Sequence, residues 1–373
     1  MPHQRLLWID ALKGLCILMV VLYHVVQQVD IHAITPFSSS LIDISDRAWS
    51  FFNWALSPLR MPVFFALSGW LAARHINAAF SSPDLVRHVV VYLWVFVVWS
   101  LILWLITYII GYFTDFRHPF YARGDLAFFS CSLYDFFYNL LVLNTGHWYI
   151  YALAIYYVLA AIFVRVKWLF FATALLLFFL SFSPSFFEVS WATLSIIRNC
   201  VFFLLGAYWG KKLLVFITDF KFFAAATLLM GLVLTYLSFS LLSWDIRLLG
   251  SFSGVLFCWL VAIQINPWFS HPVLSWLMYL GKNTLYIYVL QMAFIQAATL
   301  FFSSPSWLAV SRHEWLYLLA KLSYPMVFTT IVIFLCIAVA RLCRRYLPVL
   351  FMPPYAAVFF ATRGQWLGKS EGN

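Results

Sequence analysis

Charged residues are scarce in this sequence, and their scarcity decides its class. Only 10% of the 373 residues are charged, whereas 65% are hydrophobic and 21% are aromatic. Soluble domains contain about 25% charged residues, and no soluble fold of this length could bury so much apolar surface. The composition therefore excludes a water-soluble protein and indicates a chain whose solvent is lipid.

Cysteine is also rare, and its spacing indicates neither a metal site nor a disulfide. No pair follows the C-x-x-C pattern, and most cysteines lie in or beside hydrophobic runs, where they act as small core residues. The six positions are Cys16, Cys131, Cys200, Cys258, Cys336 and Cys343. The sequence also lacks an internal repeat of the kind that builds many transporters.

Apolar runs of about 20 residues occur along the whole chain, each long enough to cross a bilayer as a helix. Their continuity, without strand-like alternation, argues against a β-barrel. The sequence therefore predicts an all-α integral membrane protein with about ten transmembrane helices. The predicted spans are 7–29, 48–73, 89–114, 147–164, 168–182, 194–210, 222–242, 248–268, 284–303 and 314–340. Residues 133–146 are expected to form an interfacial or re-entrant helix instead of a span.

Lys and Arg are unevenly distributed between the loops, and this sets the predicted orientation. Most of the 23 fall in segments that are cytoplasmic if the N-terminus is inside. We therefore expect both termini in the cytoplasm, a transmembrane domain over residues 1–345 and a cytoplasmic tail over 346–373. The net charge of +10 is then mainly inner-face charge, which suits membrane lipid or an anionic cytosolic ligand and not nucleic acid.

The first predicted span carries three ionisable residues, although such side chains are costly inside lipid. Lys13 and His24 are eleven residues apart, so a helix brings both to within about 20° of one face. Asp10 lies three residues before Lys13, close enough to pair with it. The structural alternative is a lysine that extends to the interface and a histidine bonded to a neighbouring helix. The shared face favours a functional role.

The second predicted span contains an arginine, Arg60, that cannot lose its proton and must find an anion, a carbonyl or a hydrated cavity. Pro62 removes a backbone donor and so frees a carbonyl toward such a cavity. Ser68 and Gly69 would let another helix or a ligand approach closely. A structural ion pair is the alternative for Arg60, but acidic partners within the spans are few. An anionic or strongly polar ligand is therefore favoured.

A further set of polar residues is predicted at the two ends of the spans. Arg74, Arg87, Lys282 and Asn283 lie on the predicted cytoplasmic side and, with His75 and His88, would form a basic mouth for phosphates. Ordinary positive-inside charge explains these residues almost as well. Other polar or amphipathic residues are candidates for lining a cavity or for packing contacts: Trp148, Arg198, Gln291 and Lys321.

Four segments together resemble a known family, the membrane-bound acyltransferase 3 family, and within it the YcfT-like inner-membrane branch in particular. Residues 9–24 read ID-x-L-K-G-x8-Y-H, similar to the opening motif of that family, in which a basic residue, ten intervening residues and then His follow one another. Residues 59–70 (LRMPVFFALSGW) resemble its second signature. Residues 280–291 (LGKNTLYIYVLQ) and 146–157 (GHWYIYALAIYY) resemble two more. The likeness covers about residues 5–345.

The resemblance implies a ten-helix bundle in a bacterial inner membrane that transfers an acyl group, often acetyl, from cytosolic acyl-CoA. The implied acceptor is an envelope glycan or a lipid-linked hydroxyl on the outer side. His24 would be the base or transient acyl carrier, Lys13 its basic partner, and Arg60 would line the same cavity. Two positions depart from the family pattern. Val90 stands where an R-x-x-R motif would place its second Arg, and Gln291 where many members have His.

The residues thus favour an enzyme that uses acyl-CoA as a co-substrate, with no permanently bound cofactor and no metal. His can act as a base near neutral pH, and a cation such as Arg60 can stabilise a developing oxyanion. A carrier or flippase for an anionic lipid or an acylated sugar would use the same buried cations. A non-catalytic sensor or scaffold is a third interpretation. The sequence leaves open the acyl group, the acceptor and whether the protein forms a homodimer.

Overall fold

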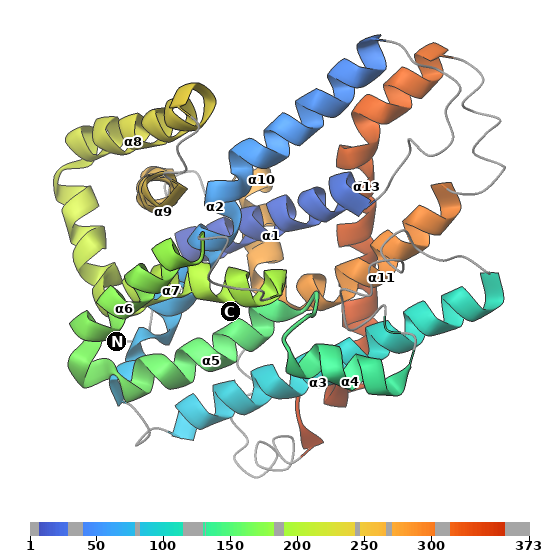
Figure 1. Cartoon of the computed structure of the whole chain (residues 1–373), viewed down its shortest axis with the longest axis horizontal. Coiled ribbons are helices and arrows are strands. Elements are labelled where there is room, and N and C mark those ends of the chain that lie inside the picture. The colour runs from blue at the N-terminus through green and yellow to red at the C-terminus, as the bar shows by residue number, and fades with distance from the viewer. Residues whose placement is uncertain are drawn as a thin grey trace. The chain divides into compact units, whose positions relative to one another are not determined.

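The computed structural model describes residues 7–28, 40–78, 83–114, 130, 132–182, 190–242, 247–265, 271–302 and 314–354. Within these ranges the only regular elements are helices (Figure 1). The α-helices are α1 (Leu7–Gln28), α2 (Ser40–Ala78), α3 (Pro83–Thr114), α4 (Leu133–Leu141), α5 (Trp148–Ile162), α6 (Lys167–Leu180), α7 (Trp191–Asp219), α8 (Lys221–Leu242), α9 (Arg247–Gln264), α10 (Pro272–Lys282), α11 (Thr284–Phe302) and α13 (Glu314–Tyr346). Two short 3-10 turns are η5 (Val164–Val166) and η7 (Pro348–Leu350).

Every predicted span coincides with one of these helices, and α4 lies in the segment expected to form a short helix. The structure adds α10, which was not predicted as a separate helix. In the structure α2 begins at Ser40, about two turns before the start of the predicted second span at residue 48. Pro58 and Pro62 both lie inside α2.

Among the residues that the structure describes, five helices are long and apolar enough to cross a membrane: α1, α2, α3, α7 and α13. The pair α5 and α6 would make a sixth span, but it is bent by 74° at the break between them. In α8, α9 and α11 the apolar stretches among the residues with described side chains are Ala224–Leu237, Leu248–Gln264 and Thr284–Ala298. The chain is therefore a multi-pass helical membrane protein, and the count of ten crossings and the cytoplasmic location of the termini remain predictions.

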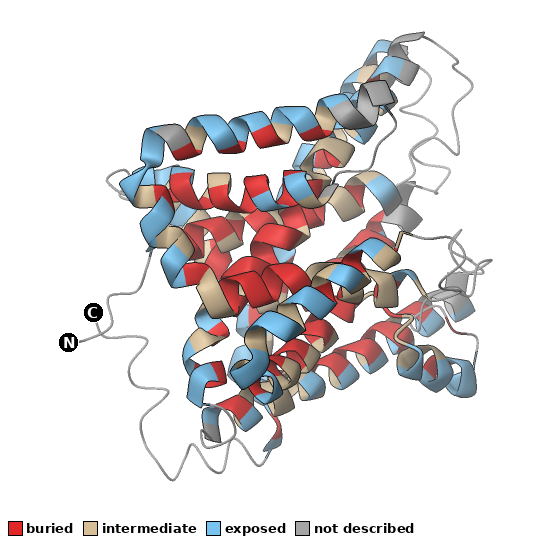
Figure 2. Cartoon of the chain, turned by 60° about the vertical axis from the view of Figure 1, so that its left-hand side comes forward, coloured by how far each residue is buried: buried red, intermediate tan, exposed pale blue. Residues whose placement is uncertain are grey.

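Large apolar side chains lie on the exposed sides of these helices. Phe222 in α8, for example, is 88% exposed, and many Leu, Ile, Val and aromatic residues of the other helices are exposed as well. Figure 2 shows the same helices with one side buried and the other exposed. Such apolar exposure would be unfavourable in water, whereas it is the expected surface of a helix in lipid.

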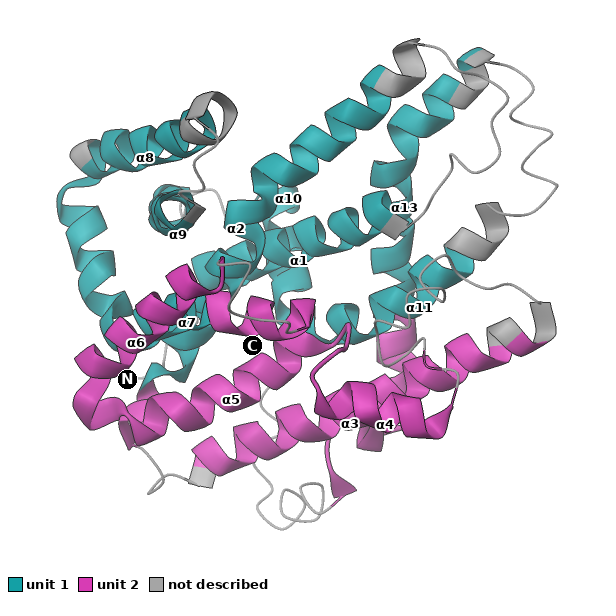
Figure 3. Cartoon of the chain, viewed as in Figure 1, with its two compact units in different colours: residues 1–73, 199–337 teal, residues 74–198, 338–373 magenta. Residues whose placement is uncertain are grey.

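The chain divides into two compact units, which are coloured in Figure 3. Unit 1 consists of residues 1–73 and 199–337, and unit 2 of residues 74–198 and 338–373. Both units are discontinuous in sequence, since α2, α7 and α13 each contribute to both. Each unit is described by itself below.

In unit 1, α1 packs against α9, α10 and α11. The contact with α10 is a direct approach of two backbones. A Cβ atom on Gly14 would lie 1.9 Å from the carbonyl oxygen of Leu277, and one on Gly281 would lie 1.8 Å from that of Asp10. Because any side chain at either glycine would separate the helices, this contact depends on glycine on both sides.

Unit 1 contains a second contact of this kind, between α2 and α7. A Cβ on Gly69 would lie 2.0 Å from the carbonyl oxygen of Phe203, and one on Gly206 would lie 1.9 Å from that of Ala66. The prediction that the Ser68–Gly69 step permits close approach is confirmed for Gly69, and the approaching element is a helix. This crossing fixes the part of α2 that follows Arg60.

In unit 2, α3 packs against α5 and η7. The indole nitrogen of Trp99 donates a hydrogen bond to the carbonyl oxygen of Leu350 at 3.0 Å, and the ring of Trp99 contacts that of Phe351. The indole nitrogen of Trp94 donates to the carbonyl of Val349 at 2.7 Å. The first residues of the predicted cytoplasmic tail are thus held against α3.

Candidate functional site

The centre of the candidate site in unit 1 is the pair formed by His24 of α1 and Arg60 of α2. The guanidinium of Arg60 lies over the ring of Tyr23, with its central carbon 4.0 Å from the ring centroid. His24 is the next residue, and its ring contacts that of Tyr23 at 5.1 Å between centroids. The structure therefore brings two of the predicted catalytic residues to the same tyrosine ring, that of Tyr23.

Arg60 is 8% exposed, and neither of its described partners is an acid. One is the face of Tyr23, and the other is the side-chain oxygen of Asn53, which accepts a long hydrogen bond of 3.4 Å. Asn53 lies seven residues before Arg60, on the same face of α2. A cation held by an aromatic face and an amide keeps its positive field, because no formal negative charge cancels it.

At the other end of α1, Asp10 lies against the junction between α10 and α11. Asp10 is buried, and its backbone carbonyl is the atom that Gly281 approaches. Lys282 follows directly and is exposed, while Asn283 donates from its side-chain amide to the carbonyl of Tyr279 at 2.8 Å. Lys13 is half-buried. The predicted pairing of Asp10 with Lys13 remains a prediction, as does donor binding by Lys282 and Asn283.

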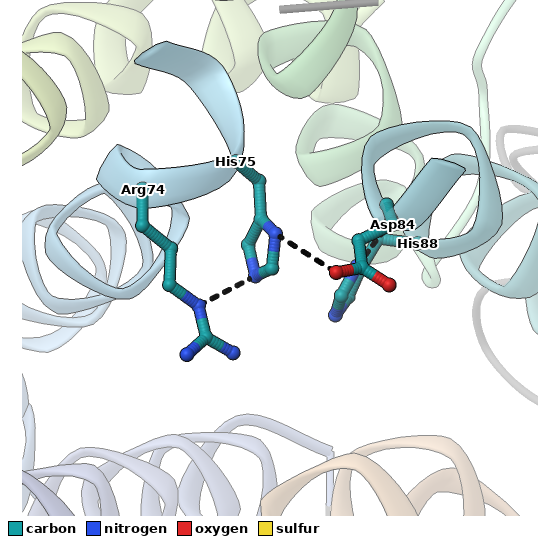
Figure 4. Close-up of polar contacts among 4 residues, drawn as sticks. All are labelled: Arg74, His75, Asp84 and His88. Carbon is teal, nitrogen blue, oxygen red and sulfur yellow. Dashed lines mark hydrogen bonds and ion pairs between the residues drawn. The ribbon is translucent and has the colours of Figure 1, made fainter. Parts of the chain in front are cut away.

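The predicted basic mouth contains an ordered cluster in unit 2, which Figure 4 shows. It joins Arg74 and His75, near the end of α2, to Asp84 and His88, near the start of α3. The Nε atom of Arg74 donates to Nε2 of His75 at 3.0 Å, and Nδ1 of His75 lies 4.0 Å from Oδ2 of Asp84. The Nδ1 atom of His88 lies 2.6 Å from the backbone carbonyl oxygen of Asp84.

The rings of His75 and His88 lie close together in this cluster, with their planes inclined by 42°. Their centroids are 4.7 Å apart, and His88 also stacks on Tyr157 of α5 at 5.8 Å. Arg87 is half-buried and within electrostatic range of Asp84. The predicted donor-binding residues thus fall into two groups: Arg74 and Arg87 belong to unit 2, whereas Lys282 and Asn283 belong to unit 1.

The remaining predicted residues each have a local setting of their own. The Ser68 hydroxyl donates to the carbonyl of Phe64 in the preceding turn. Trp148 is buried and meets the ring of Trp191 edge-on. Arg198 donates to the hydroxyl and the carbonyl of Ser181, at the end of α6. Gln291 is 1% exposed, and its side-chain oxygen has no hydrogen-bond partner among the described residues.

Sequence reasoning missed one ion pair, between Lys321 of α13 and Asp46 of α2. The ammonium of Lys321, which is 1% exposed, donates to Oδ2 of Asp46 at 2.6 Å. Asp46 was not counted among the intramembrane acids because the predicted second span began at residue 48. A signal was present, since Asp46, Asn53 and Arg60 recur every seven residues and share one face of the helix. Among the described residues, no three His, Cys, Asp or Glu side chains are placed to hold a metal ion.

Comparisons with known proteins agree with the motifs. The family model for the acyltransferase domain of the acyltransferase 3 family matches residues 6–359. The inner membrane protein YcfT of Escherichia coli (strain K12) is 28% identical over 357 residues, which cover 94% of this chain and 97% of that protein. No protein of solved structure matches this chain significantly.

Proposed function

Because this chain belongs to the acyltransferase 3 family and is therefore an acyltransferase, we propose that it acylates a hydroxyl group of the cell envelope. The donor is cytosolic acyl-CoA, with acetyl as the first group to test, and the acceptor is an envelope carbohydrate or a lipid-linked hydroxyl. The match to an inner membrane protein supports a location in the bacterial inner membrane. Acyl-CoA acts as a co-substrate, and the scheme needs no permanently bound cofactor.

The position of Arg60 beside His24 is the observation that carries this proposal. Acyl transfer needs a group that accepts a proton near neutral pH and a positive charge where the oxyanion forms. An imidazole and a guanidinium supply both. A purely structural arginine at this depth would be expected to have an acidic partner, and Arg60 has Tyr23 and Asn53 instead.

Two chemical routes are open to this pair. In direct transfer, His24 removes the proton from the acceptor hydroxyl while its oxygen bonds to the thioester carbonyl carbon. The carbon–sulfur bond then breaks, and the imidazolium returns the proton to the leaving thiolate to give free CoA. In the two-step route, an unprotonated ring nitrogen of His24 bonds to the thioester carbonyl carbon, the carbon–sulfur bond breaks, and CoA leaves with the ring proton as the free thiol. The acceptor hydroxyl then attacks the acyl-imidazole, the carbon–nitrogen bond breaks, and the hydroxyl proton returns to the ring. Arg60 would stabilise the oxyanion in either route.

The residues predicted to bind the phosphates of the donor form two separate groups: Arg74 and Arg87 in unit 2, and Lys282 with the neutral Asn283 in unit 1. Guanidinium groups bind phosphate with paired hydrogen bonds, which supports the two arginines in particular. Lys13 and Asp10 would act as a basic residue and its acidic partner on α1, in the same unit as His24. Val90, in place of the second Arg of the R-x-x-R pattern, makes Arg74 the arginine most suited to supply the missing charge.

Reconstituted protein tests this proposal directly. We expect wild-type protein to release free thiol from acetyl-CoA in the presence of an envelope extract, and His24→Ala to lose this activity. His271→Asn is the matched control, because His271 is an exposed imidazole at the start of α10 and an asparagine can still accept the hydrogen bond from the backbone N–H of Val273. Mass spectrometry of envelope glycans and lipids, with and without the protein, would identify the acyl group and the acceptor. Undiminished transfer by a stably folded His24→Ala protein contradicts the assignment.

A carrier or flippase is the second candidate, and the 74° bend between α5 and α6 is the observation that favours it. Interrupted membrane helices line the substrate sites of many transporters. Such a protein would move an anionic lipid or an acylated sugar without thioester chemistry. Purified protein that transports the acylated product between vesicle leaflets, and releases no thiol from any acyl-CoA, would support the carrier.

A further inference from the structure

The cluster of Figure 4 determines where the protons of its two histidines reside. A guanidinium nitrogen can only donate, so Nε2 of His75 accepts from Nε of Arg74 and carries no hydrogen. The ring proton of His75 is then on Nδ1, the atom that faces Oδ2 of Asp84. A backbone carbonyl can only accept, so Nδ1 of His88 carries a hydrogen and donates it to the carbonyl of Asp84.

Two hydrogen bonds and one longer electrostatic contact, the 4.0 Å approach of Asp84 to His75, form a chain that runs from α3 to the guanidinium of Arg74. His88 holds the backbone of Asp84, the Asp84 carboxylate faces the N–H of His75, and His75 holds Arg74. His75 is 7% exposed, and its ring is packed against that of His88. Its orientation is therefore fixed by neighbours on two sides.

Arg74, in contrast, is exposed, and His75 engages only its Nε atom. In Figure 4 the two terminal nitrogens of Arg74 point away from His75 and Asp84. A long arginine side chain ordinarily loses conformational entropy when it binds an anion, and holding it in advance reduces that loss. The terminal edge is thus presented in a fixed direction to an anion outside the cluster.

We propose that His75 and Asp84 are positioning residues that hold Arg74 for a phosphate group of the acyl-CoA donor. This inference rests on the proposed function, because it assumes that the donor carries phosphates to this end of α2 and α3. In this chain of contacts from His88 to Arg74, called the relay below, the two histidines have different roles. His75 acts on Arg74 directly, whereas His88 fixes the first turn of α3 and stacks on Tyr157.

The relay also makes donor binding sensitive to acid in a defined way. A second proton on His75 would occupy Nε2, remove the acceptor for Arg74 and place like charges side by side. The charged or titratable groups around His75 are Arg74 on its own helix, Asp84, Arg87 and His88 on α3, and Tyr157 on α5. Because His88 is a second imidazole and the donor phosphate can also take up a proton, a variant that changes only His75 is needed to separate their effects.

Two substitutions of His75 provide this separation. In His75→Gln, the amide oxygen can still accept from Arg74 and the amide N–H₂ can still face Asp84, but the side chain does not titrate. In His75→Leu, the acceptor is lost. We expect His75→Leu to weaken donor binding about tenfold, the loss of one hydrogen bond to a charged group. His75→Gln should bind almost as wild type does, with a KM for acyl-CoA that stays flatter between about pH 7.5 and about pH 5.5.

The decisive measurement is CoA binding by nanodisc-embedded protein in a His24→Ala background, where no turnover occurs. Wild-type His75, His75→Gln, His75→Leu, Asp84→Ala and Arg74→Gln are compared with Arg165→Gln, which removes an exposed charge elsewhere in unit 2. The expected result is weaker binding by His75→Leu, Asp84→Ala and Arg74→Gln, with His75→Gln and Arg165→Gln unchanged. In active protein, His75→Leu, Asp84→Ala and Arg74→Gln should raise the KM for acyl-CoA and leave kcat nearly constant.

Each contrary result has a distinct meaning. If CoA binds and His75→Leu binds it as tightly as the parent, the relay inference is wrong while the proposed function stands. If the parent does not bind CoA at all, the proposed function itself fails. Nanodiscs of phosphatidylcholine and of phosphatidylglycerol test for a lipid headgroup as the anion. An effect of His75→Leu on phosphatidylglycerol binding, with none on CoA, would overturn the donor assignment.

Discussion

The two units hold their key arginines in opposite ways. Arg60 in unit 1 is 8% exposed and rests on an aromatic face and an amide, whereas Arg74 in unit 2 is exposed and is held through a histidine and an aspartate. A buried cation with neutral partners exerts a strong field over a short distance, because little solvent screens it. An exposed cation is screened, so its orientation matters more than its field. The first arrangement suits charge stabilisation during a reaction, and the second suits recognition of an anion.

The largest effect is expected from replacing the imidazole of unit 1. His24→Ala should lower kcat about a thousandfold and change the KM for acyl-CoA little, because general acid–base catalysis is lost while donor recognition remains. The measurement is thiol release and acyl transfer by reconstituted protein. A His24→Ala protein that loses affinity for CoA while keeping its kcat would contradict this difference between the units, since donor recognition would then depend on the imidazole of His24.

A somewhat smaller loss of kcat is expected when Arg60 is replaced by a residue of the same charge and a different shape. Arg60→Lys should lower kcat about a hundredfold, because a compact ammonium cannot lie over Tyr23 and reach Asn53 at once. Asn53→Ala should have a milder effect of about tenfold, because it removes one hydrogen bond to a charged group. The matched control is Arg165→Lys, which should leave kcat unchanged. A fully active Arg60→Lys would mean that only the charge of this residue is needed.

The positions of the helices could largely be predicted from the sequence, because a continuous apolar run of the length of a membrane span rarely forms anything but a membrane helix. The exception, α10, shows the limit of that reasoning. Its eleven residues are too few to span a bilayer, and nothing in their pattern reveals that Gly281 contacts the backbone of Asp10. That contact joins two distant parts of the chain, and only the folded structure contains it.

The candidate site was predictable to a different degree in the two units. His24 and Arg60 stand out because ionisable residues are rare in apolar helices, so each one is conspicuous. Asn53 and Asp84 do not stand out, since a neutral amide within a helix and an acid in a first turn are common features. Their importance depends on which side chains they contact in the folded protein. The same is true of Asp46, because its partner Lys321 lies on the distant helix α13.

Lys321 sharpens the comparison, because it is a cation of unit 1 that does have an acidic partner, Asp46. Asp46→Asn removes the carboxylate that faces the ammonium of Lys321, whose side chain is 1% exposed. This change should destabilise the protein by about 2 kcal/mol. Lys321→Met should cost about half as much, because Asp46 is 33% exposed and remains hydrated. Thermal unfolding in detergent measures both. The kcat of the surviving folded protein should not change, in contrast to Arg60→Lys.

The smallest effect concerns the support of α3 in unit 2. Trp99→Phe removes the hydrogen bond from the indole nitrogen to Leu350 while keeping an aromatic ring beside Phe351, and should destabilise the protein by about 1 kcal/mol. Trp94→Phe is the paired control, because its bond to Val349 is exposed and its loss should cost less. Neither change touches His75 or Asp84, so CoA affinity should remain that of the parent. If Trp99→Phe weakens CoA binding as much as His75→Leu does, donor recognition in unit 2 depends on the general stability of α3, and the bonds that orient Arg74 have no special role.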